Sequence, residues 1–211
     1  MQVLFVHGMG RSPLSGGLLL WLLKCAGLKV RVFGYSVSFD GFAGIKARLV
    51  ERISQVAAQG NYVLVGHSLG GVLLRAALND LPPGTRRASH LFLLGSPVRP
   101  ARLAQRLRNN PVYKIVTRDC GRLLGSAERM AEVGSVTVPT TVVVGLRGLP
   151  WPKDPFDGEP NDGVVARSEV CADWAGEEVH VSVGHTFLPS SRHVARLILE
   201  RIGVQAELSA R

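Results

Sequence analysis

The segment from Tyr62 to Leu74 constrains the fold more than any other part of this sequence. It joins an apolar run, Tyr62–Val65, to the pentapeptide Gly66-His67-Ser68-Leu69-Gly70 and then to a helical run, Leu69–Asn79. Such a pentapeptide between a buried strand and a helix is typical of a tight, strained turn that lifts a serine hydroxyl above a sheet. The pentapeptide alone arises easily by chance in a glycine-rich chain, so the strand and helix around it carry the prediction.

The rest of the chain repeats this alternation of short apolar runs and longer helical segments. The predicted strands are mostly apolar and rich in Val or Leu, as strands buried on both faces are. Alternating strands and helices predict an α/β fold, with a mostly parallel sheet of about six strands flanked by helices. The predicted strands are Gln2–Val6, Lys29–Tyr35, Tyr62–Val65, His90–Leu94, Thr140–Val144 and Val179–Val183, and the predicted helices are Leu14–Lys24, Phe42–Gln59, Leu69–Asn79 and Pro189–Arg201.

Two segments depart from this alternation. Residues 96–138 are helical and basic and contain no good strand, which predicts a small helical cap over the sheet edge. Residues 146–160 form a loop dense in Pro, Gly and Asp that carries Trp151 and Phe156, and loops of this length are often functional. We expect a single domain over residues 1–211, with 96–138 as a cap insertion.

Ser68 is the predicted nucleophile, and acyl transfer to it needs two backbone N–H groups aimed at the developing oxyanion. In this architecture one belongs to the residue after the nucleophile, here Leu69. The other belongs to the loop after the first strand, which reads Val6-His7-Gly8-Met9-Gly10 and offers the N–H of Met9. A glycine-rich helix start can bind phosphate instead. However, no Walker lysine or dinucleotide fingerprint follows Ser68, which favours the nucleophile.

The general base should follow the last strand, because the chain order in this architecture is Ser, then Asp or Glu, then His. His185 lies just past that strand, whereas His180 lies within it and His193 lies in the final helix. Asp162 is the predicted acid, since turn residues give way there to an apolar run. It would hold His185 in the right tautomer and stabilise its imidazolium. The competing acids are Asp154, Asp157, Glu159, Glu169 and Asp173.

Together these motifs resemble those of bacterial lipase- and esterase-like α/β-hydrolases. The matching pieces are Val6-His7-Gly8-Met9-Gly10, Gly66-His67-Ser68-Leu69-Gly70-Gly71, Asn161-Asp162-Gly163-Val164-Val165 and Gly184-His185-Thr186-Phe187. The resemblance spans almost the whole chain. It implies the α/β-hydrolase fold and a Ser-His-Asp triad that cleaves carboxylic esters through an acyl-enzyme. A thioesterase or acyltransferase would use the same intermediate, and a non-catalytic ligand-binding protein is possible on the same scaffold.

The predicted substrate is a small acyl ester. Its candidate contacts, besides the catalytic set, are His7, His67, Trp151 and Phe156. We predict no metal and no other cofactor. The chain shows no clear calcium-site aspartates, and its three cysteines (Cys25, Cys120 and Cys171) have neither metal spacing nor redox pairing.

The net charge of +9 raises the question of an anionic partner. The arginines are spread along the chain and form no dense tract with interleaved aromatics. We therefore expect a solvated basic surface and no nucleic-acid binding, with transient contact to an anionic surface left open. No apolar run approaches the roughly 18 residues of a membrane span, and the first strand follows Met1 without a secretory leader. A cytoplasmic protein is the default expectation, and the oligomeric state is not predicted.

Overall fold

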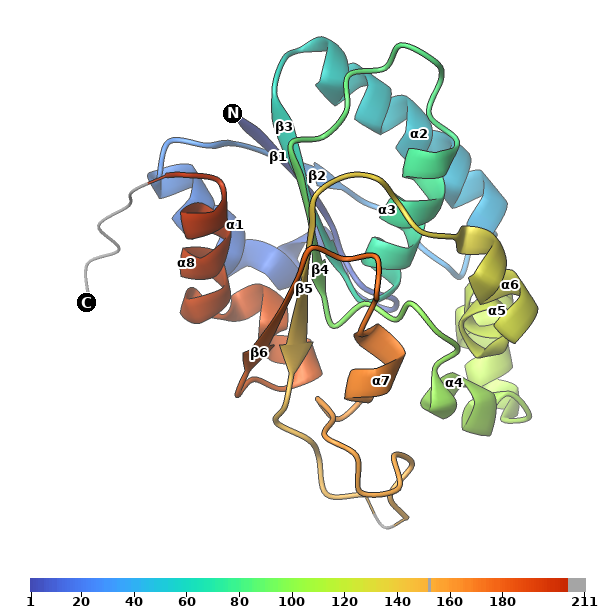
Figure 1. Cartoon of the computed structure of the whole chain (residues 1–211). Helices are drawn as coiled ribbons and strands as arrows, with labels where there is room; N and C mark the ends of the chain where they lie inside the picture. The colour runs from blue at the N-terminus through green and yellow to red at the C-terminus, as the bar shows by residue number, and fades with distance from the viewer. Residues whose placement is uncertain (152, 205–211) are drawn as a thin grey trace.

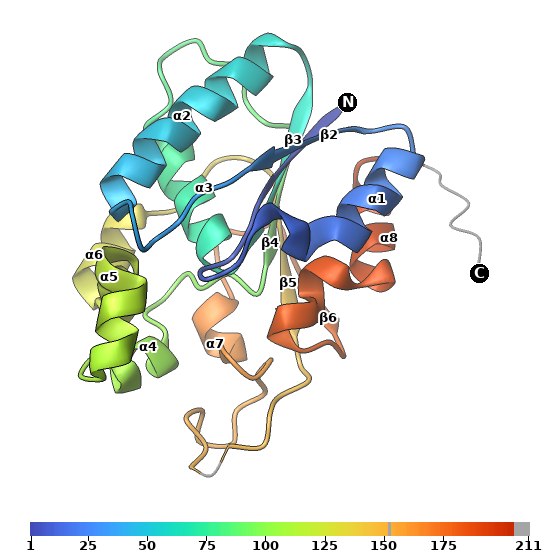
Figure 2. The same ribbon diagram turned by 180° about the vertical axis from the view of Figure 1, so that it is seen from behind.

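The computed structural model describes residues 1–151 and 153–204, in which six parallel strands form one sheet with helices on both faces (Figures 1 and 2). The strand order is β2-β1-β3-β4-β5-β6. The strands are β1 (Gln2–Val6), β2 (Lys29–Phe33), β3 (Tyr62–His67), β4 (His90–Leu94), β5 (Thr140–Gly145) and β6 (Glu177–Val181). The helices are α1 (Gly17–Cys25), α2 (Phe42–Ala58), α3 (Leu69–Asn79), α4 (Arg102–Leu107), α5 (Pro111–Gly125), α6 (Ala127–Val133), α7 (Arg167–Val170) and α8 (Arg192–Arg201), with 3-10 turns η1 (Pro13–Gly16) and η2 (His185–Ser190).

The sheet separates two apolar layers, because successive side chains of a strand point to opposite faces. In β1, Leu4 and Val6 pack in the layer of α2 and α3, whereas Val3 and Phe5 pack in the layer of α1 and α8. The regular apolar face of α2 lies in the first layer. Burial on both sides explains why the central strands read as continuous apolar runs, and the predicted fold class is confirmed.

The two edge strands differ from the predicted ones because one side of each meets solvent. β2 ends two residues earlier than predicted, since the N–H of Tyr35 donates to the ring of His7 at 3.3 Å. β6 begins and ends two residues earlier than predicted. Its first residue, Glu177, accepts a hydrogen bond from Thr141 of β5 at 3.0 Å. Most residues of β2 and β6 are exposed or half-buried, so these strands give a weaker apolar signal than strands buried on both faces.

The last predicted helix also starts later than its apolar pattern suggests. The chain passes through η2 first, and α8 begins only at Arg192. Pro189 has no N–H to donate within a longer helix. Ser191 then caps α8, because its side chain accepts the N–H of Val194 at 3.4 Å.

The basic segment 96–138 is helical, as predicted, and forms α4, α5 and α6 beside the α2–α3 layer (Figure 1). Arg75 of α3, only 2% exposed, holds both ends of this segment. Its guanidinium donates to the carbonyl oxygens of Pro97 and Gly134 and lies 5.3 Å from the ring centroid of Trp174. Burial lowers the pKa of Arg75 to about 10. The function of the segment as a cap stays a prediction.

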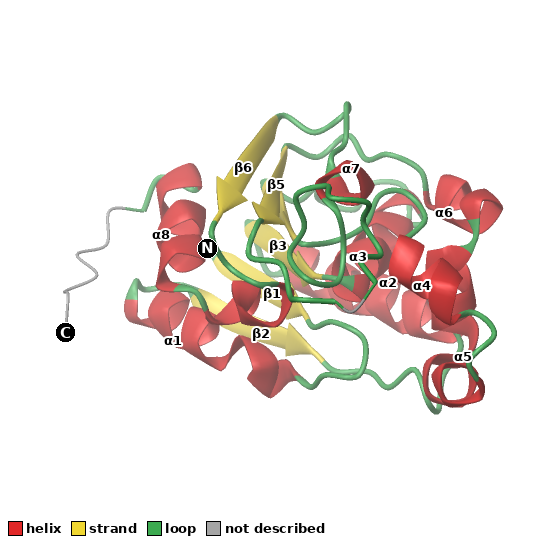
Figure 3. Ribbon diagram, turned by 90° about the horizontal axis from the view of Figure 1, so that it is seen from below, coloured by secondary structure: helices red, strands yellow, loops and turns green. Residues whose placement is uncertain are grey.

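Figure 3 looks onto the carboxyl ends of the strands, where ligand sites of open α/β sheets lie. The loop of residues 146–160 extends beyond these ends, with α4 and α5 to one side. No helix within residues 1–151 and 153–204 is both long enough and apolar enough to cross a bilayer.

Candidate active site

Ser68 lies in a sharp turn between β3 and α3, at the carboxyl edge of the sheet. Its backbone has φ 53° and ψ −125°, which is strained for a residue with a side chain. A Cβ on Gly66 would lie 2.5 Å from the Cα of Gly71, and one on Gly70 would collide with the carbonyl oxygen of Val6. Only glycine fits at these two positions. The side chain of Ser68 is partly exposed, whereas the residues on either side of it are buried.

The loop after β1 passes directly beside this turn. A Cβ on Gly8 would lie 3.2 Å from the Cβ of Ser68. The N–H groups of Met9 and Leu69 donate to no other group in the described part of the chain. Two unpaired N–H groups flanking a serine are the donors that an oxyanion requires. The loop that carries Met9 thus lies beside the Ser68 turn, and the role of the two N–H groups as oxyanion donors stays a prediction.

His7 fixes the orientation of the Met9 N–H. Its Nε2 accepts the N–H of Tyr35, so its Nδ1 carries the proton and donates to the carbonyl oxygen of Gly8 at 2.8 Å. Because a peptide unit is planar and trans, holding the Gly8 carbonyl aims the Met9 N–H in the opposite direction. The ring stacks on Tyr35 with 4.3 Å between centroids. Burial lowers the pKa of His7, although its bond to Gly8 opposes this.

His185 and Asp162 form a hydrogen-bonded pair, as the predicted base and acid would. The Nδ1 of His185 donates to the Oδ2 of Asp162 at 2.6 Å, and both side chains are buried. The other carboxylate oxygen accepts the N–H groups of Val164 and Val165 at 3.0 and 2.9 Å. The N–H of His185 also donates to the carbonyl oxygen of Asp162 at 2.9 Å. With Nδ1 engaged, Nε2 is the free ring nitrogen, as a general base requires.

Gly95 places this pair next to the nucleophile turn. The N–H of Ser68 donates to the carbonyl of Leu94 at 3.0 Å, and Gly95 follows at once. A Cβ on Gly95 would lie 2.9 Å from the Oδ2 of Asp162 and 3.1 Å from the Nδ1 of His185. Within the described residues, the Ser68 hydroxyl makes no hydrogen bond. Such catalytic contacts are often long before substrate binds and tighten afterwards.

His67 holds the backbone of His185 through a hydrogen bond to its carbonyl oxygen. It is 2% exposed, its Nε2 donates to the carbonyl of His185 at 3.0 Å, and the two rings lie 4.9 Å apart between centroids. Burial holds the pKa of His67 well below its usual value. His7 and His67 are thus buried and each bonds to a backbone carbonyl, and substrate contact by either stays a prediction.

The other acidic candidates are engaged elsewhere. The carboxylate of Asp154 accepts two N–H groups of its own loop. Asp157 lies in the same loop at φ 53°, and Asp173 is exposed near Arg99. Of the competing histidines, His180 contacts Glu178 at 2.5 Å. Of the candidate acids within residues 1–151 and 153–204, Asp162 is the one that is hydrogen-bonded to a candidate histidine, His185.

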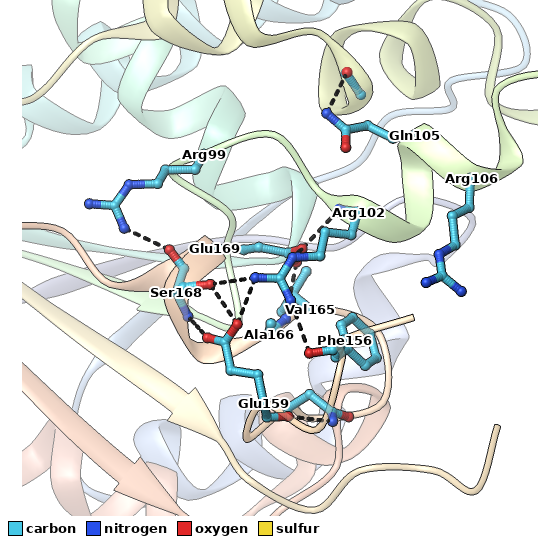
Figure 4. A network of polar contacts seen from close by, with 12 residues as sticks. Arg99, Arg102, Gln105, Arg106, Phe156, Glu159, Val165, Ala166, Ser168 and Glu169 are labelled. Carbon is cyan, nitrogen blue, oxygen red and sulfur yellow. Dashed lines mark hydrogen bonds and ion pairs between the residues drawn. The ribbon is translucent and has the colours of Figure 1, made fainter. Parts of the chain in front are cut away.

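Glu159 and Glu169 belong to a polar network around Arg102, shown in Figure 4. Arg102 donates to the carboxylate of Glu159 at 2.7 Å and to the carbonyl of Phe156 at 3.0 Å. The buried carboxylate of Glu169 accepts the N–H groups of Arg102 and Ala166. Burial raises the pKa of Glu169. The network fastens α4 to the chain on both sides of Asp162. The sequence carried no signal for it, because Arg102 is distant in sequence from the segments that it joins.

The two predicted aromatic contacts take different positions. Trp151 is 39% exposed, and its indole N–H donates at 3.3 Å to the carbonyl of Gly163, beside Asp162. Phe156 is fully buried beneath the Arg102 network. Substrate contact by either stays a prediction. Among residues 1–151 and 153–204, no three His, Cys, Asp or Glu side chains are grouped to hold a metal ion.

Comparison with known proteins shows similarity in structure alone. No protein-family model matches the sequence, and no curated protein matches it. Among solved structures, a lipase of Bacillus licheniformis matches with a TM-score of 0.70 and 15% identity over 97% of this chain and 92% of that one. Methylketone synthase I of tomato matches with a TM-score of 0.66 and 13% identity, over 96% and 97%. A thioesterase of Streptomyces coelicolor matches with a TM-score of 0.59 and 15% identity, over 97% and 85%.

These matches show similarity of fold, and their identities are too low to transfer an activity. Fold and function are separate conclusions, since one fold carries many chemistries. With six parallel strands, helices on both faces and lipase and thioesterase structures as neighbours, the chain has the α/β-hydrolase fold.

Proposed function

We propose that this protein is a serine hydrolase that cleaves carboxylic esters through an acyl-enzyme formed on Ser68. The observation that carries the proposal is the convergence of a strained serine turn, two unpaired N–H groups and a buried His–Asp pair at one sheet edge. These are the parts that acyl transfer needs. A pure binding protein has no requirement for all of them.

In this proposal the geometry assigns each group a step. Ser68 attacks the acyl carbon while His185 takes its proton at Nε2. The oxyanion that forms is stabilised by the N–H groups of Met9 and Leu69, and Asp162 stabilises the imidazolium. His185 then gives the proton to the leaving alcohol. Water then attacks the acyl-enzyme while His185 takes its proton. The acid leaves as His185 returns the proton to the oxygen of Ser68.

Thioester cleavage is the second candidate, because a structural neighbour is named a thioesterase and the same acyl-enzyme serves both reactions. The test compares p-nitrophenyl butyrate with a butyryl thioester, for the parent, Ser68→Ala and Ser96→Ala. Ser96 is a matched control, since it is fully buried and lies against Gly71, near the same turn.

We expect Ser68→Ala to lose at least about 10⁴-fold in kcat/KM on the preferred substrate. Ser96→Ala should keep most of it. Equal rates for Ser68→Ala and the parent would contradict the proposed nucleophile. A much higher kcat/KM on the thioester than on the ester would make the proposed substrate a thioester. The proposed acyl-enzyme mechanism would stay the same.

A further inference from the structure

The outer side of α5 carries exposed apolar side chains that the described residues do not cover. Val112, Ile115 and Val116 are 69%, 74% and 47% exposed. Their spacing places them on one side of the helix. Phe39 is 85% exposed and lies beside them, since the hydroxyl of Ser38 donates to the carbonyl of Val116 at 3.2 Å. We call these four side chains the α5 apolar face. A contiguous exposed apolar surface commonly marks an interaction site.

The same helix pair is strongly basic. Residues 101–126 contain six Lys or Arg and one acid, Asp119, which is paired with Arg129 at 2.7 Å. Five of the nine net positive charges of the chain thus come from this stretch. A hollow of about 310 Å³ lies between α4 and α5, and no acidic residue lines it. The cations that line it, which form no ion pair within the described ranges, are Arg108, Lys114, Arg118 and Arg122.

Arg118 joins the hollow to the apolar face. It interrupts α5 with φ 46° and ψ −127°, a strained backbone for a residue other than glycine. Its guanidinium donates to the carbonyl of Ser38 at 2.7 Å, next to Phe39. The strain is therefore located where a cation connects the two halves of one surface.

This surface lies on the same side of the molecule as the candidate active site. Figures 1 and 3 place α4 and α5 beside the carboxyl ends of the strands, where the loop of residues 146–160 also lies. The Arg102 network fastens α4 to the segment that carries Asp162. A large partner bound to α5 would thus lie on the side of the molecule that carries α4 and the loop of residues 146–160.

We propose that the α5 apolar face and the cationic hollow form a docking surface for an anionic lipid bilayer. The apolar side chains would enter the interface, and the hollow would take the phosphate of a headgroup. Apolar side chains bordered by cations are the combination that binds anionic bilayers, because burial of apolar area and attraction to headgroups add. An acidic protein or a second copy of this chain would be the competing occupant.

The experiment measures cosedimentation with vesicles of phosphatidylcholine alone or mixed with equal phosphatidylserine. It uses full-length Ser68→Ala protein, so that binding is read without hydrolysis and independently of the proposed function. We expect binding to the mixed vesicles only, weakened by salt. Adding Lys114→Gln and Arg122→Gln to this protein should weaken binding to the mixed vesicles about 25-fold, since each charge near the membrane surface contributes about 5-fold. Val112→Ser/Ile115→Ser should weaken it at unchanged charge.

The matched control is Arg86→Gln/Arg87→Gln, which removes two exposed cations from the loop between α3 and β4, at the other end of the strands. The protein with this pair of substitutions should bind the mixed vesicles nearly as well as the Ser68→Ala protein does. Equal binding to both vesicle types, or an equal loss in the control pair, would overturn the proposal. So would a parent that ignores vesicles and forms a dimer that Val112→Ser/Ile115→Ser dissociates. Circular dichroism verifies that each variant is folded.

Discussion

Ser68 and Arg118 have almost the same backbone conformation in two very different surroundings. Their φ and ψ angles are 53° and −125° against 46° and −127°. Around Ser68, two glycines allow the turn to pack against β1 and α3, and the His185–Asp162 pair lies close by. Arg118 interrupts α5, and its guanidinium donates to the carbonyl of Ser38. The same strained backbone conformation therefore occurs with very different neighbouring groups, and those groups determine the function of the side chain.

The largest loss of rate should come from changing Asp162, which lies near Ser68 and has no counterpart near Arg118. Asp162→Asn keeps the shape of the residue but removes the charge that stabilises protonated His185. We expect kcat for ester hydrolysis to fall roughly 10⁴-fold. The matched control is Asp154→Asn in the loop of residues 146–160, whose carboxylate caps local N–H groups, and its rate should stay within a few-fold of the parent. A reversal of these two results would mean that the acid is misassigned.

A smaller loss in rate should follow from releasing the Gly8 peptide. His7→Phe keeps a ring against Tyr35 but removes the donor to the Gly8 carbonyl, so the Met9 N–H is held less firmly. We expect kcat to fall about 10- to 100-fold with little change in KM, less than the roughly 10²- to 10³-fold lost with a whole oxyanion donor. Tyr35→Phe, which removes only a hydroxyl bonded to the His7 carbonyl, should have less effect. A rise in KM alone would indicate substrate contact by His7.

The close packing around Ser68 should be visible in stability. Gly70→Ala would push a methyl group into the carbonyl oxygens of Val6 and His7, which are backbone atoms and cannot move aside easily. We expect a loss of about 3 kcal/mol in the free energy of unfolding, measured with urea. Gly44→Ala in α2 meets no atom within 4 Å and should stabilise the protein by up to about 1 kcal/mol. Equal effects would contradict the tight turn.

The smallest change in the free energy of unfolding should come from relieving the backbone strain at Ser68 or Arg118. Ser68→Gly and Arg118→Gly should each raise the free energy of unfolding by roughly 0.5–1 kcal/mol, since glycine accepts this conformation but costs some entropy. Ser68→Gly should abolish hydrolysis, and Arg118→Gly should retain it on a small soluble ester. Loss of activity in Arg118→Gly would show that the two strained residues are functionally coupled.

The central half of the fold was predictable because its signals are local. The strand, turn and helix around Ser68 follow from a buried apolar run, two glycines and a helical pattern that are contiguous in sequence. β1 and β4 have their predicted bounds for the same reason. The edge strands were displaced, since a half-solvated strand such as β6 mixes Glu and His with Val.

The supporting parts of the site were not predictable from one sequence. Substrate contact by His7 and His67 stays a prediction, whereas the hydrogen bonds that these rings make to the carbonyls of Gly8 and His185 have no local sequence signal. The arginines were expected as a group on a solvated surface, but Arg75 is buried against backbone carbonyls and Arg102 pairs with the carboxylate of Glu159. Contacts between distant segments depend on packing, which residue order alone does not specify.

Covalent labelling with a fluorophosphonate tests the central claim most directly. The probe reacts with a serine only when a base and an oxyanion site activate it. We expect the folded parent to gain the mass of one adduct, located by peptide mapping on Ser68. Neither Ser68→Ala nor the urea-unfolded parent should gain it. A folded parent that stays unlabelled, or that carries the adduct on another residue, would contradict the assignment of Ser68, His185 and Asp162 as a catalytic set.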